Sequence, residues 1–92
     1  MSSALKEHIH KRIPSHIKKE PHFRALLDHI KEQNIETAEH LKDFLEKQIS
    51  LVEGWLENNK HRSETSVKSV RDKKIQLDVL KKCYNLTQEF LL

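Results

Sequence analysis

The chain has 92 residues, of which 34% are charged and 36% are apolar. This length allows one domain with a small core, since domains commonly contain about 100–150 residues. With one glycine, two prolines and one cysteine, the composition excludes a glycine-rich phosphate loop, an intramolecular disulfide and a cysteine-based zinc site, and it disfavours sheet folds with many turns.

The net charge of +3 is unevenly distributed. Residues 1–34 carry 7 basic and 4 acidic groups, residues 35–59 carry 2 and 6, and residues 60–92 carry 8 and 4. An acidic segment between two basic ones can be neutralised by packing within one molecule, so basic character alone does not indicate nucleic-acid binding. The chain lacks a signal-peptide pattern and any apolar run of about 18 residues. We therefore expect a cytoplasmic protein with no membrane contact.

Short helices are predicted within residues 3–34. The first has an apolar residue at every fourth position, namely Leu5, Ile9 and Ile13. Pro14 ends or kinks this helix because it disfavours helical backbone at the residue before it. Pro21 suits the first turn of the next helix, which should end at Asn34, a residue that tolerates left-handed backbone. The apolar face of that helix contains Phe23, Leu26, Leu27 and Ile30.

Two longer helices, residues 37–59 and 65–92, are predicted to form an antiparallel hairpin because their connection is short. Thr37 is a suitable N-cap for the first of them. The main apolar stripe of that helix contains Ala38, Leu41, Leu45, Ile49, Val52 and Leu56. From residue 75 onwards the last helix is apolar around a wide arc, which is typical of burial on two sides.

We therefore predict an all-α fold with a single helical domain over residues 1–92. One or two shorter N-terminal helices would pack on the long hairpin, in a three- to four-helix bundle. With the turn near Arg62, Leu45 would lie opposite Val79.

A second apolar stripe of residues 37–59 has no partner within the hairpin. It contains Phe44, Leu51 and Trp55, and it faces residues 68–74, which are mostly charged. The N-terminal region, a second copy of the chain or another protein could each cover it. Burial of one such side chain contributes about 1.5–3 kcal/mol, so this cover matters. We predict a partner-binding surface formed by this stripe and a basic rim of Lys60, Arg62 and Lys73.

Candidate catalytic and metal-binding residues are sparse. None of the seven histidines pairs at the i, i+3 or i, i+4 spacing of a helical metal site. Cys83 falls in the apolar arc of its helix, which favours a small buried hydrophobe over a nucleophile. We expect no enzymatic activity, no metal, no cofactor and no small-molecule substrate.

The expected function is that of a non-enzymatic helical interaction module, such as an adaptor, regulator or inhibitor, which binds another protein or a second copy of itself. The alternative is a nucleic-acid-binding module that uses residues 60–74. Its phosphate contacts would come from Lys60, Arg62, Lys68, Arg71, Lys73 and Lys74. If these cations instead pair with Glu53 and Glu57 of the neighbouring helix, the cluster is explained without nucleic-acid binding.

Overall fold

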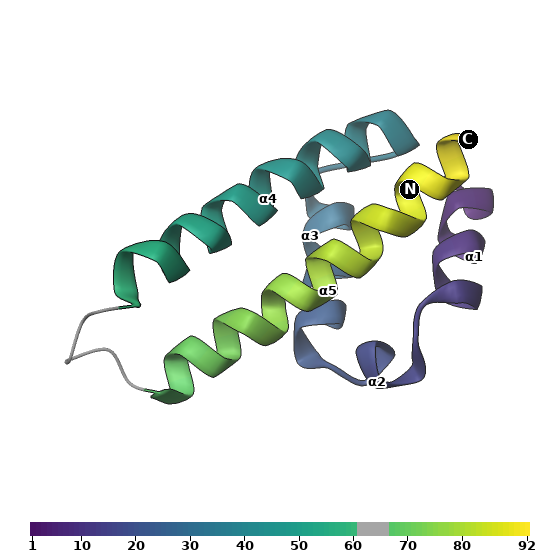
Figure 1. The fold of residues 1–92 in the computed structure, drawn as a ribbon. Coiled ribbons are helices and arrows are strands. Elements are labelled where there is room, and N and C mark those ends of the chain that lie inside the picture. Colours follow the sequence, from purple (N-terminus) through teal and green to yellow (C-terminus); the bar gives the residue numbers. More distant parts are fainter. Residues whose placement is uncertain (61–66) are drawn as a thin grey trace.

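In a computed structural model, which describes residues 1–60 and 67–92, the chain is a bundle of helices (Figure 1). The described residues contain no strand, and the prediction of a small all-α bundle is confirmed. Three short helices precede two long ones. They are α1 (Ser3–Arg12), α2 (Ser15–Lys18), α3 (Pro21–Glu32), α4 (Ala38–Asn59) and α5 (Val67–Leu91).

Local chemistry sets the helix boundaries where the sequence predicts them. Pro21 occupies the first turn of α3, where its missing N–H leaves no hydrogen bond unmade. Asn34 adopts left-handed backbone with φ of 54° and ends the α3 segment. The Thr37 hydroxyl accepts a hydrogen bond from the backbone N–H of His40 at 3.1 Å, which caps α4. The predicted turn at Arg62 and the predicted helix start at residue 65 lie outside the described residues.

Helix α5 is the element on which the others pack. It contacts α4 along the hairpin, and it also contacts α1 and α3 (Figure 1). Its C-terminal half is consequently buried on two sides, and the buried residues are Val79, Leu80, Cys83 and Thr87. The Thr87 hydroxyl donates a hydrogen bond to the carbonyl oxygen of Cys83 at 2.8 Å, so this buried polar group is satisfied.

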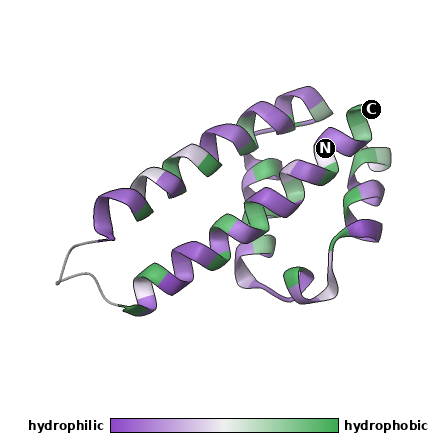
Figure 2. Ribbon diagram, viewed as in Figure 1, coloured by the Kyte–Doolittle hydropathy of each residue, from purple (hydrophilic) through white to green (hydrophobic). Residues whose placement is uncertain are grey.

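The three short helices anchor themselves to the core through regularly spaced apolar residues. Figure 2 shows hydrophobic bands on α1, α2 and α3 and along the middle of α5. Even α2, a single turn in a segment with no clear sequence signal, contributes a fully buried residue, Ile17. The core contribution of the N-terminal segment comes from Leu5, Ile9, Ile13, Ile17, Phe23, Leu26, Ile30 and Ile35.

The hairpin is longer than the group of helices that covers it. The molecule measures 45 × 24 × 24 Å, and the hairpin end that carries residues 50–60 and 67–71 extends beyond the three short helices (Figure 1). We call this part the distal half of the hairpin. It contains α4 and α5 without a third layer.

Polar side-chain contacts join the two helices of the hairpin. The Tyr84 hydroxyl donates a hydrogen bond to Glu46, and Lys81 forms an ion pair with Glu53. A cavity bordered by Phe44 of α4 and Val79 of α5 lies in the same part of the hairpin, which agrees with the predicted placement of Leu45 opposite Val79.

Gly54→Ala should stabilise the protein. Gly54 lies within α4, its φ is not positive, and an added Cβ would meet no atom within 4 Å. Because glycine weakens a helix interior, the free energy of unfolding should rise by about 0.5–1 kcal/mol in urea titrations. An unchanged or lower value would show that the distal half of the hairpin requires the glycine for another reason.

Candidate protein-interaction surface

The three residues of the second stripe of α4 lie in different surroundings. Phe44 is half-buried and borders a small cavity of about 90 Å³ that it shares with side chains of α3 and α5. From α3 the cavity is lined by His22, Ala25, Leu26 and His29. The N-terminal region therefore covers this end of the stripe.

The other two residues of the stripe lie in the distal half of the hairpin. The Leu51 side chain is 61% exposed, and Trp55 is only partly buried. The ammonium group of Lys73, on α5, lies 5.6 Å from the centroid of the Trp55 ring. Such a cation–π contact contributes about 0.5–1 kcal/mol at an exposed site and holds the lysine next to the ring. Leu51, Trp55 and Lys73 form what we call the distal surface.

A polar contact marks where α3 stops covering the hairpin. A ring nitrogen of His22, in the first turn of α3, lies 2.9 Å from a carboxylate oxygen of Asp72 on α5. Lys73 follows directly in α5 and is turned toward Trp55. Asp72 and Lys73 are thus adjacent in α5 but contact different helices, α3 and α4 respectively. The sequence carries no signal for the His22–Asp72 pair, since the two residues are 50 positions apart.

The predicted basic rim is only partly assembled. Lys73 belongs to the distal surface, whereas Lys60 forms an ion pair with Glu57 of its own helix end at 2.9 Å. Arg62 lies outside the described residues. The structure therefore brings together Leu51, Trp55 and Lys73, and it separates Phe44 from them.

The remaining predicted cations form a different feature. Lys68, Arg71 and Lys74 are exposed and recur every three residues, which places them in one row on α5. None of them forms an ion pair with another residue of the described segments 1–60 and 67–92. Glu53 binds Lys81 and Glu57 binds Lys60, so these two carboxylates do not neutralise the row. Lys73 is directed to Trp55 and stands apart from it.

Two residues of α5, Cys83 and Tyr84, have raised pKa values, and packing within the hairpin causes both shifts. Burial raises the pKa of the Cys83 thiol to about 12, so the thiolate is suppressed at neutral pH. The pKa of Tyr84 is raised first by its hydrogen bond to Glu46, at 2.6 Å, and then by desolvation and nearby carboxylates. Both residues thus serve packing and hairpin pairing.

No group of three or more histidine, cysteine or carboxylate side chains among the described residues could hold a metal ion. In the same part of the chain, no helix combines the length and apolarity needed to cross a bilayer.

Comparison of the chain with protein-family models, with curated proteins and with solved structures finds no significant match. A functional assignment therefore rests on the side chains and their surroundings.

Cys83 should behave as a buried structural thiol. Aromatic disulfide reagents should leave the native protein unmodified at pH 8 and should react when urea unfolds it, because only the unfolded chain exposes a thiol that ionises near its ordinary pKa of 9.0. Since the folded-state pKa is the higher one, the free energy of unfolding should fall as pH rises above about 9. Cys83→Ala should remove the part of this fall that begins near pH 9, while the raised pKa of Tyr84 maintains a fall above about pH 10. Rapid modification of the native wild type would contradict the prediction.

Proposed function

We propose that the protein is a non-enzymatic interaction module whose distal surface binds an acidic amphipathic helix of another protein. A cytoplasmic setting, which is reducing, suits its free thiol at Cys83. The observation that carries the proposal is the 61% exposure of Leu51 beside a partly buried Trp55. A tryptophan flanked by an aliphatic residue and a cation resembles the anchor of a binding hot spot.

A helix is the partner element that fits this surface. Phe44, Leu51 and Trp55 recur at helical spacing on one side of α4, and α3 already packs against that side at Phe44. The distal half of the hairpin presents the continuation of this side without α3. A partner helix would bury its apolar stripe on Leu51 and Trp55, as in other helix-in-groove complexes.

Charge favours an acidic partner over a second copy of the chain. Lys73 flanks the anchor, and the row of Lys68, Arg71 and Lys74 lies on the same part of α5. A two-fold symmetric dimer through the distal surface would bring each copy's cations toward those of the other, which costs electrostatic energy. Glutamates beside the apolar stripe of a partner helix would instead complement these charges.

The test uses a designed amphipathic peptide with leucines at positions i, i+3, i+4 and i+7 and glutamates beside them. Trp55 is the single tryptophan, so its fluorescence reports binding directly. The acidic peptide should change the emission in a saturable way, and Leu51→Glu should weaken binding at least tenfold. Leu91→Glu, at the other end of α5, is the matched control and should bind as the wild type does.

Three results would overturn this proposal. The first is equal binding of a peptide in which lysines replace the glutamates, and the second is no binding of either peptide. The third is a dimer in light scattering that Leu51→Glu converts to a monomer, since a second copy would then occupy the surface. Circular dichroism of each variant confirms that the helices are retained.

A second candidate function rests on the exposed row of Lys68, Arg71 and Lys74, because these cations have no ion-pair partner among the described residues. They could contact successive phosphates of a nucleic acid. Replacing all three by glutamine should then reduce the slope of log affinity against log salt by about 2.7, since each contact with duplex DNA contributes about 0.9.

The matched control for the second candidate replaces Lys11, Lys42 and Lys47 by glutamine. It removes the same charge from α1 and α4 and should leave most of the salt dependence in place. An equal effect of the two triple variants would show that only net charge matters, and absence of binding at low salt would end this candidate.

A further inference from the structure

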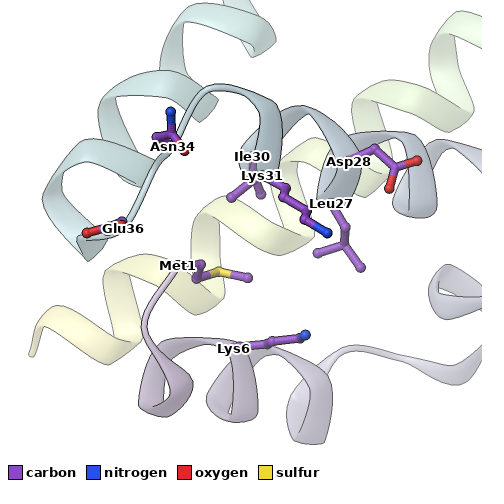
Figure 3. A pocket seen from close by; sticks show the side chains of 8 residues that line it. All are labelled: Met1, Lys6, Leu27, Asp28, Ile30, Lys31, Asn34 and Glu36. Carbon is purple, nitrogen blue, oxygen red and sulfur yellow. The ribbon is translucent and has the colours of Figure 1, made fainter.

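We propose that the cavity between α1 and α3 binds a carboxylate that carries an apolar chain, such as a medium-chain fatty acid. This site is independent of the distal surface, and it goes against the expectation from sequence that the protein takes no small molecule. The cavity has a volume of about 420 Å³, within the range of about 300–1,000 Å³ typical of small-molecule sites. Figure 3 shows its lining, which comes from the N-terminal segment, α1, α3 and the connection to α4.

One part of the lining is apolar. Ile30 is 4% exposed and belongs to the protein core, while Leu27 and Met1 are half-buried. In Figure 3 the side chains of Met1 and Leu27 extend into the space between α1 and α3. An aliphatic chain laid against these three residues would bury apolar surface on both sides of the contact, at about 25 cal/mol per Å².

The other part of the lining is cationic. Lys6 of α1 and Lys31 of α3 both line the cavity, and Figure 3 shows Lys31 pointing from α3 toward α1 and Lys6 lying along the side of α1 that faces α3. The ammonium group of neither lysine forms an ion pair or hydrogen bond with another residue of the described part of the chain. Two ammonium groups from different helices that share one cavity repel each other, and a bound anion between them would convert that repulsion into attraction.

A histidine of α1, His10, lies near the cations of the cavity. His10 lies one turn after Lys6 and packs edge to face on Phe23 of α3, with ring centroids 5.8 Å apart. Its pKa is lowered first by burial and then by the charges of Lys6 and Lys18. The contact between α1 and α3 therefore continues from the cavity into an aromatic pair, and its cations are not neutralised locally.

Two carboxylates at the cavity disfavour ligands with more than one negative charge. Asp28 and Glu36 border the cavity, but in Figure 3 their carboxylate groups point away from its centre. They leave the two lysines free and would repel a doubly charged phosphate more than a singly charged carboxylate. The chemistry of the site thus favours a monoanion with an aliphatic tail.

The experiment is a titration of the full chain with decanoate below its micelle-forming concentration, followed by amide NMR shifts. Saturable shifts should appear at residue 6, at residues 27–31 and at residues 34–36. Replacing Lys6 and Lys31 together by glutamine should raise the dissociation constant at least tenfold. The matched control replaces Lys11, which is 72% exposed and paired with Glu7, together with Lys47, and it should bind decanoate normally.

Decanol tests the contribution of the carboxylate charge, and acetate tests the contribution of the aliphatic chain. Both should bind at least tenfold more weakly than decanoate. If decanol binds as tightly as decanoate, or if the Lys6/Lys31 double variant binds decanoate as tightly as the wild type does, the assignment of the lysines is overturned. Absence of saturable shifts would overturn the site itself. Shifts centred on Leu51 and Trp55 would place decanoate on the distal surface, whereas normal decanoate binding by Leu51→Glu would show that the two sites are separate.

Discussion

Burial of α5 on two sides is the constraint on which the rest of the structure depends. A helix of 25 residues is about 38 Å long, whereas the 12 residues of α3 extend about 18 Å. The short helices can therefore cover only part of α5, and they cover the part whose apolar arc is widest. The buried residues Val79, Leu80 and Cys83 all lie there. Apart from the contact of Asp72 with His22 of α3, the charged segment of residues 68–74 is left with α4 as its partner, and this division creates the distal half of the hairpin.

The distal half shows how one helix face can have two different surroundings. Phe44 and Trp55 occupy the same stripe of α4, but α3 packs beside the first and stops before the second. Lys73 partly covers Trp55 with a side chain that a partner can displace, since an exposed cation–π contact contributes about 0.5–1 kcal/mol. The aromatic ring thus has one weakly held cationic neighbour, which the helix binding that we propose would have to displace or retain.

Local signals in the sequence predict the helices well, because each depends on a few neighbouring residues. The proline at position 21, the left-handed Asn34 and the Thr37 cap act within one turn, and apolar periodicity identifies the core side of each helix. The coverage of the second stripe depends instead on where α3 ends against α5, and the His22–Asp72 contact that marks this limit joins residues 50 positions apart. The cavity at Lys6 and Lys31 could not be predicted from the sequence for the same reason, because the two lysines lie on different helices.

Lysines without an ion-pair partner are common on protein surfaces, and a single one carries little information because an exposed ion pair contributes only about 0–1 kcal/mol. Arrangement distinguishes the two groups considered above. Lys6 and Lys31 are exposed residues of separate helices that border one cavity, and apolar side chains line that cavity beside them. Lys68, Arg71 and Lys74 share one helix face, and Lys68 and Arg71 border a pocket of about 460 Å³ whose lining residues all belong to α5. The first arrangement combines cations with an apolar lining from separate elements, which is why we propose for it a ligand of defined charge and shape, whereas the second offers positive charge on a single helix.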